Sequence, residues 1–323
     1  MGTFHPSSLV PHPCRYGLVN FTNMKNVLKY ILLIAGLVWQ GSLVAQVTFQ
    51  VVTKTVENTF PYQNGNEVNI EGEKAEIQVE TWNRNEVKVL VELIAKHPDK
   101  KTAQADLEMM VYTSEQHGKK LYFRNYVSVP QGKSKPASDL KAIYTITLPA
   151  DCPVYLKNNY GLAYVSNLNN TLRINSEFSK IGLENLRGKV GIQTRFGDVE
   201  GKNIDGDVTI NSRRSNLTLH DIKGNWNIHS QYGILKFFTN PSPELLSLNI
   251  DAEKSDVYFF DPKPNFYGYT LTAHYGNISV PNDLKFNYLE NTDQLKKAVF
   301  SSKIGSSNIS IKISFGDITI RNP

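Results

Sequence analysis

The feature that most constrains the fold of this chain is an 18-residue repeat between positions 152 and 237. A small residue preceded by an aromatic or cationic residue recurs five times, at Gly161, Ser179, Gly197, Ser215 and Gly233. Apolar residues recur seven and five positions before each small residue and two positions after it. Within each unit they alternate with polar residues, and a spacing of two is typical of β-strands, not of helices.

The constant period predicts stacked coils. Because one residue type returns every 18 positions, equivalent side chains can lie about 4.8 Å apart in a parallel stack. A single unit cannot bury its apolar residues, whereas a stack can. Residues 185–188 and 203–206 supply Asn and Gly, which tolerate left-handed backbone at corners. The sequence therefore predicts an all-β, single-chain β-solenoid (β-helix) with about 18 residues per coil over residues 151–323; the alternative is a β-sandwich.

The period loosens after residue 237. The small-residue signature returns at Ser255, Gly276 and Gly316, with surplus residues between the units. We expect roughly eight coils from Val154 to Pro323. The surplus residues after position 240 and at 283–297 are expected to form loop insertions that project from the stack.

Residues 46–150 lack this period but contain other patterns. Apolar and polar residues alternate in several segments, namely Val68–Ile70, Ala75–Glu80, Glu86–Leu93, Lys120–Phe123 and Ile143–Leu148. Apolar residues spaced four apart in Thr102–Tyr112 indicate a short helix. The sequence predicts a β-rich N-terminal cap that covers the end of the stack, where unpaired strand edges would invite aggregation. A separate second domain is the alternative.

Residues 24–45 have the pattern of a secretory signal peptide. Lys25 and Lys29 precede the apolar run Ile31–Val38, and small residues follow up to Ala45. We expect cleavage between Ala45 and Gln46. The alternative, a transmembrane anchor, would require an apolar run of roughly 20 residues. Residues 1–23 are interpreted as a non-native upstream extension, with translation starting at Met24, and no transmembrane segment is expected in the mature chain.

Removal of the signal changes the charge of the chain. The full sequence has 35 basic and 30 acidic residues, a net charge of +5, but residues 1–45 contain three basic residues and no acidic one. The mature chain therefore has 32 basic and 30 acidic residues, a net charge of +2. A near-neutral exported chain argues against nucleic acid as a partner. Cys152 is left without a second cysteine, and we interpret it as a buried, inert thiol.

No catalytic, cofactor-binding or metal-binding residues are predicted. The histidines are scattered, and His220 and His229 fall in wet positions of the repeat, where we expect them to be exposed and without partners. The segment Gly182–Lys189 has five residues between its glycines instead of the four of a phosphate loop, and Val190 stands where Ser or Thr is required.

The position two before each small residue predicts an exposed ligand face. It holds Glu177, Arg195, Arg213 and Gln231, which would line up on one side of the stack. Glu177 and Arg195 can pair across adjacent coils, whereas Arg195 and Arg213 would be neighbours of like charge. Such a face could bind an anionic glycan; the alternative is a solvated ladder of side chains. Aromatic residues that could stack on sugars are Tyr155, Tyr258, Phe259, Tyr267 and Tyr269.

Three features resemble a known family. The segment Ala75–Leu93, the segment Tyr144–Pro149 and the repeated Tyr/Phe-Gly-x-Val/Ile units resemble the bacterial putative-adhesin family of the DUF4097 type. The signal ending at Ala45-Gln46 is similar to those of Bacteroidetes. This resemblance implies an exported β-solenoid located in the periplasm, at the outer-membrane surface or outside the cell. It implies no established activity and no catalytic residues.

These patterns together predict an exported, non-catalytic module with a binding and structural role, whose partner is a glycan or a cell-envelope protein and which uses no cofactor. The alternative is a carbohydrate-active enzyme of the polysaccharide lyase or hydrolase type on a β-helix, although the paired carboxylates of glycoside hydrolysis are not evident. A third possibility is a periplasmic component that serves a membrane or signalling partner. The oligomeric state is left open.

Overall fold

The computed structural model describes residues 48–239, 244–304 and 307–322. These residues form strands and one helix, α2 (Lys100–Leu107), as the predicted all-β class with one short helix requires. The predicted signal peptide, its cleavage site between Ala45 and Gln46 and the upstream extension lie outside the described residues. Among the described residues, no helix has the length and apolar character needed to span a bilayer.

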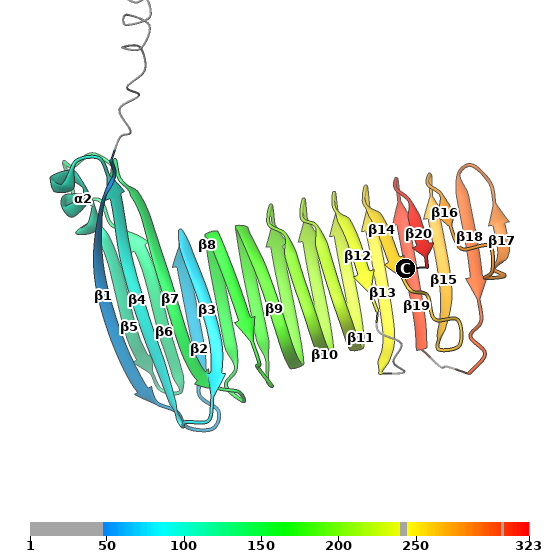
Figure 1. Ribbon diagram of the computed structural model, residues 1–323, viewed down its shortest axis with the longest axis horizontal. Coiled ribbons are helices and arrows are strands. Elements are labelled where there is room, and N and C mark those ends of the chain that lie inside the picture. The colour runs from blue at the N-terminus through cyan, green and yellow to red at the C-terminus, as the bar shows by residue number, and fades with distance from the viewer. Residues whose placement is uncertain (1–47, 240–243, 305–306, 323) are drawn as a thin grey trace, which may run out of the picture. The chain divides into compact units, whose positions relative to one another are not determined.

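Twenty strands in the described residues belong to one open, hydrogen-bonded sheet (Figure 1). In the N-terminal part they are β1 (Gln50–Pro61), β2 (Glu67–Glu73), β3 (Ala75–Trp82), β4 (Glu86–His97), β5 (Met110–His117), β6 (Lys120–Val127) and β7 (Asp139–Pro149). In the repeat region they are β8 (Val154–Ser166), β9 (Leu172–Arg195), β10 (Val199–Arg213), β11 (Leu217–Gln231) and β12 (Ile234–Phe238). Beyond it they are β13 (Leu245–Glu253), β14 (Asp256–Phe260), β15 (Tyr267–His274), β16 (Ile278–Ser279), β17 (Asn287–Asn291), β18 (Leu295–Phe300), β19 (Ser307–Ser314) and β20 (Ile318–Arg321).

The strands are arranged in two rows that face each other across the core. The first row runs β5–β6–β2–β8–β9–β10–β11–β13–β19–β15–β18–β17. The second row runs β1–β4–β7–β3–β8–β9–β10–β11–β12–β14–β20–β16. Aromatic rings from opposite rows meet between them, as Tyr112 of β5 and Tyr144 of β7 do at 6.0 Å.

The long strands β8–β11 take part in both rows because their backbone turns at left-handed residues. Asn185 and Asn203 each have φ of 53°, and Gly188 and Gly206 also have positive φ, as predicted for the corners. Strands β8 to β11 pair in parallel with an 18-residue offset, so that Val199 lies opposite both Ile181 and Leu217. The period read from the sequence is therefore the pairing offset of this region.

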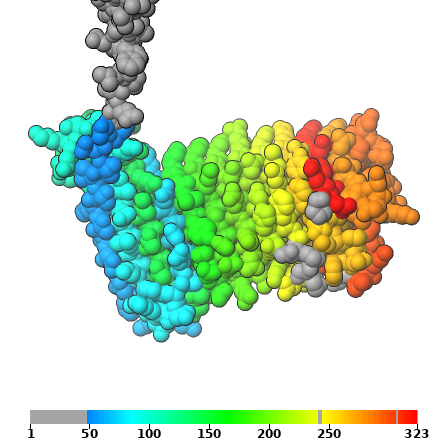
Figure 2. All heavy atoms as spheres, viewed as in Figure 1, coloured from blue at the N-terminus to red at the C-terminus, as the bar shows by residue number. Residues whose placement is uncertain are grey.

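The order of the strands departs from the expected succession of coils after β12. The offset grows to 22 residues between β12 and β14, where the Gly233 N–H donates to Ser255 Oγ at 3.1 Å. Strands β19 and β20, the last in the chain, lie between β13/β14 and β15/β16. In Figures 1 and 2 the red C-terminal residues accordingly lie between yellow and orange ones. Strands β15 and β16 precede β19 and β20 in the chain but lie farther along the rows. The prediction of sequential coils to Pro323 is therefore wrong here.

Both ends of the rows contain strands that were not predicted. Residues 283–297, expected as a loop insertion, contain β17 and the first residues of β18, which form a hairpin on β15. At the other end, β1 and β5 are the outer strands, and the predicted helix at Thr102–Tyr112 is α2 followed by the start of β5. Helix α2 is capped by Asp99, the residue before it, whose carboxylate accepts a hydrogen bond from the Thr102 N–H at 2.9 Å. Of the loop insertion expected after position 240, residues 240–243 lie outside the described residues.

Candidate functional site

The outer surface of the first row carries three parallel lines of side chains, because every second residue of a strand points outward and the parallel register places residues 18 apart side by side. Line A consists of Tyr155, Arg173, Gly191, Thr209 and Asn227. Line B consists of Lys157, Asn175, Gln193, Asn211 and His229. Line C consists of Asn159, Glu177, Arg195, Arg213 and Gln231.

Line C contains the four residues of the predicted ligand face. Arg195 Nη1 lies 3.4 Å from Glu177 Oε1, and both side chains are exposed. Arg213 lies beside Arg195 in the register and makes no ion pair within the part of the chain that the structure describes. Gln231 Nε2 donates to Glu253 Oε2 at 3.2 Å. Glu253 extends line C because the 22-residue offset brings β13 beside β11, which the 18-residue period did not indicate.

A hollow of about 610 Å³ lies over line C. Its carboxylates are Glu177, Asp251 and Glu253, and none of them is buried. Glu177 and Glu253 lie four strand spacings apart in line C, about 19 Å, whereas the two carboxyl groups of a glycosidase lie roughly 5 to 10 Å apart. Asp251 and Glu253 lie closer together, on one strand, but the Glu253 carboxylate already accepts a hydrogen bond from Gln231. This arrangement suits hydrogen bonding to a ligand better than acid–base catalysis.

A second hollow of about 660 Å³ adjoins the first. The two share Asn175, Gln193 and Asn211, the amide side chains of line B. We call the two hollows together the polar groove. It crosses the first row from β6 to β13, and exposed or half-exposed amide, guanidinium and phenol groups point into it.

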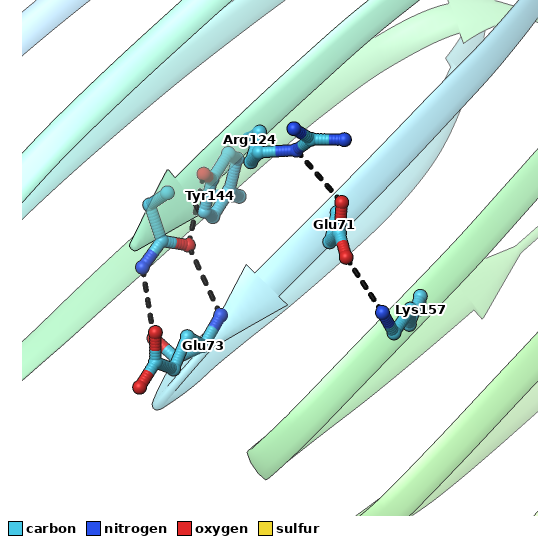
Figure 3. Close-up of polar contacts among 6 residues, drawn as sticks. Glu71, Glu73, Arg124, Tyr144 and Lys157 are labelled. Carbon is cyan, nitrogen blue, oxygen red and sulfur yellow. Dashed lines mark hydrogen bonds and ion pairs between the residues drawn. The ribbon is translucent and has the colours of Figure 1, made fainter. Parts of the chain in front are cut away.

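At one end of the polar groove, Glu71 of β2 links β6 and β8 through ion pairs (Figure 3). Its carboxylate lies 2.6 Å from Lys157 Nζ on β8 and 2.7 Å from Arg124 Nε on β6. The hydrogen bond from Lys157, assisted by the charge of Arg124, lowers the pKa of Glu71 below its ordinary value. Nearby, the Tyr144 hydroxyl donates to Asn125 Oδ1 at 3.0 Å. The amide of Asn125 in turn donates to the Glu73 carbonyl at 2.8 Å, which ties β6 to β2.

We expect the Glu71 cluster to make stability depend on pH. Because the pKa of Glu71 is lower in the folded state, its contribution is present above the unfolded pKa and is lost as the pH falls through the folded pKa. Glu71→Gln should destabilise the protein at pH 7 by less than about 1 kcal/mol, since the side chain is one-third exposed and solvent screens the pair. Urea unfolding should show this deficit shrinking below about pH 5. The exposed Glu200→Gln serves as the control, and a deficit that does not change with pH would contradict the assignment.

Arg173 and Tyr155 form the wall of the hollow next to Gly191. The guanidinium carbon of Arg173 lies 5.1 Å from the centre of the Tyr155 ring, a cation–π contact. Gly191 follows Arg173 in line A and leaves a gap in the row of side chains. Sequence analysis named Tyr155 but missed Arg173 and Gly191, although the position six before each small residue, read down the repeat, would have shown them. Glu71 and Arg124 could not be found in this way because they precede the repeat.

Cys152 and the two repeat histidines differ in how they match the expectations. Cys152 is buried, and burial raises the pKa of its thiol to about 12, as expected of an inert cysteine. His229 is exposed, as expected. His220 is half-buried and stacks on Phe238 at 4.4 Å between ring centres, so it is not without a partner. Within the described residues, no three His, Cys, Asp or Glu side chains gather into a possible metal site.

The aromatic residues proposed for sugar stacking divide into two groups. Phe259, Tyr267 and Tyr269 are fully buried in the core, so the prediction that they contact a ligand is wrong. Tyr155 and Tyr258 are half-exposed, and each lies under an arginine, Tyr258 under Arg321 at 5.4 Å. The alternation of the strands separates the two groups, because Tyr155 and Tyr258 are flanked by buried residues and face outward. Phe259 shares the buried face of β14, and Tyr267 and Tyr269 share that of β15.

An exposed ladder of large side chains runs along the corner before the small residues. Its first members, Tyr160, Phe178 and Phe196, have left-handed backbone and stack with ring centres 4.9 and 4.7 Å apart. The Arg214 guanidinium continues the ladder 5.4 Å from the Phe196 ring. Stacking of roughly 0.5 to 1.5 kcal/mol per pair offsets the strain of left-handed bulky residues. Since neighbours occupy the ring faces, we assign the ladder a structural role.

Comparisons with known proteins give only distant similarities. No family model matches the chain, and no curated protein matches it. A crystal structure of a putative adhesin from Bacteroides fragilis is 11% identical with a TM-score of 0.42, covering 83% of this chain and 97% of that one. A putative cell adhesion protein from Clostridium sporogenes is 13% identical with a TM-score of 0.25, covering 84% and 100%. A putative lipid binding protein from Parabacteroides distasonis is 8% identical with a TM-score of 0.38, covering 84% and 95%. At these values the similarities assign no family, and the resemblance to the DUF4097-type family stays a prediction.

Proposed function

We propose that this chain is an exported, non-catalytic binding module that holds a glycan along the polar groove. The observation that carries this proposal is the unbroken row of amides in line B, Asn175, Gln193 and Asn211, shared by two adjoining hollows. Each amide both donates and accepts hydrogen bonds, which matches the hydroxyl groups of a sugar chain. The strands of the sheet hold these groups at a regular spacing of about 4.8 Å, which suits an extended, repetitive ligand better than a folded protein.

Two further parts of the proposal rest on the sequence and the register. Export rests on the signal-peptide pattern of residues 24–45. We also infer that the repeat forms 18-residue β-solenoid coils over β8 to β11. The 18-residue parallel offset and the left-handed corners at Asn185 and Asn203 support this inference. A non-catalytic role is supported by the exposed, widely spaced or occupied carboxylates of the groove.

We expect an array of neutral and acidic glycans to retain the full chain, and Gln193→Ala/Asn211→Ala to weaken the binding at least tenfold. Loss of two hydrogen bonds of roughly 1 kcal/mol each accounts for this change. Both residues are exposed on the outside of strands, so the variant should keep the stability of the wild type. The control is Gln78→Ala, an exposed glutamine on the outer side of the second row, which should bind like the wild type.

The glycan array, a capture assay with cell-envelope proteins and an assay for newly formed glycan ends separate the alternatives. Retention of no glycan by the wild type, or equal losses in the Gln78→Ala control, would contradict the proposal. Retention of a cell-envelope protein in place of any glycan would replace it with a protein partner. New reducing or unsaturated ends that appear with the wild type and disappear in Arg195→Ala would establish the enzyme alternative.

A further inference from the structure

The two halves of the polar groove differ in charge. The half over Gly191 is lined by three cations, Arg124, Lys157 and Arg173, and by one carboxylate, Glu71. The half over line C is lined by two cations, Arg195 and Arg213, and by three carboxylates, Glu177, Asp251 and Glu253. The groove is therefore positive at the Gly191 end and slightly negative at the other end.

The positive charge at the Gly191 end is not neutralised within the cluster. Glu71 is one charge shared between Lys157 and Arg124, each of which touches a different carboxylate oxygen. Arg173 makes no ion pair in the described part of the chain, and its guanidinium is exposed and held over the Tyr155 ring. A planar guanidinium fixed in this way is arranged for bidentate contact with a carboxylate.

The fold does not require glycine at position 191. Its φ is not left-handed, and an added Cβ would come no closer than 3.8 Å to its nearest neighbour, the Arg173 Cγ. Glycine inside a strand costs roughly 0.5 to 1 kcal/mol relative to alanine. The packing gives no compensation for this cost, since a side chain would fit. What glycine provides at this position is the open space beside Arg173, with Gln193 and Asn175 at its edge.

We propose that the hollow over Gly191 binds the carboxylate of an acidic polysaccharide. The carboxylate pairs with the Arg173 guanidinium, while Lys157 and Arg124 add to the positive field around it. The sugar ring occupies the space left by Gly191, and its hydroxyl groups contact the amides of line B. This inference rests on the proposed function and names the class of glycan and the place of its acidic group.

The test measures dissociation constants of the full chain for four carboxylated polymers, which are polygalacturonate, alginate, hyaluronan and polysialic acid. We expect at least one of them to bind, and the same polymer with esterified carboxyl groups to bind at least tenfold more weakly. Gly191→Gln should lose at least tenfold because its side chain fills the hollow, and its thermal unfolding should match that of the wild type. Arg173→Gln should also lose at least tenfold. The matched control Arg187→Gln removes an exposed arginine outside the groove and should bind like the wild type.

Several results would overturn the inference without touching the proposed function. They are equal binding of the esterified polymer, unchanged binding by Gly191→Gln, binding of neutral glycans alone, or tighter binding of dextran sulfate than of every carboxylated polymer. By contrast, binding of no glycan at all, neutral or acidic, would overturn the proposed function itself. Binding that weakens equally in Arg173→Gln and Arg187→Gln would reduce the interaction to non-specific attraction between charges and would also overturn the inference.

Discussion

Gly197→Ala is expected to lower the free energy of unfolding by about 3 kcal/mol or more. A Cβ at this position would lie 1.9 Å from the carbonyl oxygen of Ser179 and 2.7 Å from its carbonyl carbon. Both atoms belong to the backbone of β9, so they cannot move aside as a flexible side chain could. Relief of the clash would require β9 and β10 to separate at the corner, where their register is otherwise continuous.

The reason lies in an alternation of glycine and serine along this corner. Gly161, Ser179, Gly197, Ser215 and Gly233 follow one another in successive repeat units. The N–H of Gly161 donates to Ser179 Oγ at 3.0 Å, and the N–H of Gly197 donates to Ser215 Oγ at 3.3 Å. Each glycine thus gives room to the backbone before it, and each serine hydroxyl accepts the N–H of the glycine before it. The residue type at this corner is set by the neighbouring repeat unit, not by the local strand.

Urea unfolding followed by circular dichroism measures the effect of Gly197→Ala. Gly191→Ala is the matched control, since the same change six residues earlier places a Cβ in open space. It should leave the stability unchanged or raise it by up to about 1 kcal/mol. If the two variants were equally stable, the close approach of the backbones at Gly197 would not be a feature of the protein in solution.

The sequence predicted the parallel register of β8 to β11, because there the period and the pairing offset are the same physical quantity. Each strand of β8 to β11 pairs with the strand one period away, so alternation, corners and register all follow from one number. After Gly233 the spacing of the repeat signature no longer gives the pairing offset of the strands. The signature at Ser255, Gly276 and Gly316 is visible, but its spacing does not reveal that Gly316 lies between the other two in space. A strand that returns to an earlier place in a parallel row leaves no local trace in the sequence.

The candidate site was likewise predictable only where it follows the repeat. Line C was found because charged residues recur at one position of the repeat, and Glu177 and Arg195 do meet across adjacent repeat units. Tyr155 was named as an aromatic residue, but line A was not recognised as a line, because Tyr155, Arg173 and Gly191 share a position in the repeat and no chemical property. The Glu71 cluster depends on β2 lying between β6 and β8, a pairing between residues 86 positions apart. No pattern within residues 46–150 specifies that neighbour.

Trp226→Ala is expected to destabilise the protein by roughly 3 to 5 kcal/mol. Trp226 is fully buried, and its Nε1 donates to the Lys223 carbonyl at 2.8 Å. The equivalent position of the preceding repeat unit holds Val208, so the tryptophan is larger than the repeat requires. It lies beside the shift in register at Gly224/Asn225, where the offset between β11 and β13 changes from 21 to 22 residues. We infer that the large ring fills the space opened by this irregularity.

Comparison with Trp226→Leu separates this explanation from ordinary core burial. Leucine matches the residue that follows in the row, Leu248, and retains much of the buried apolar surface. If the register shift opens extra space, leucine leaves a cavity and should still cost more than about 1.5 kcal/mol in urea unfolding. If the site were an ordinary position of the repeat, leucine should fit with a loss of less than about 1 kcal/mol. The second outcome would mean that the rows close up at Gly224 without the ring, and that the change of offset needs no large residue to stabilise it.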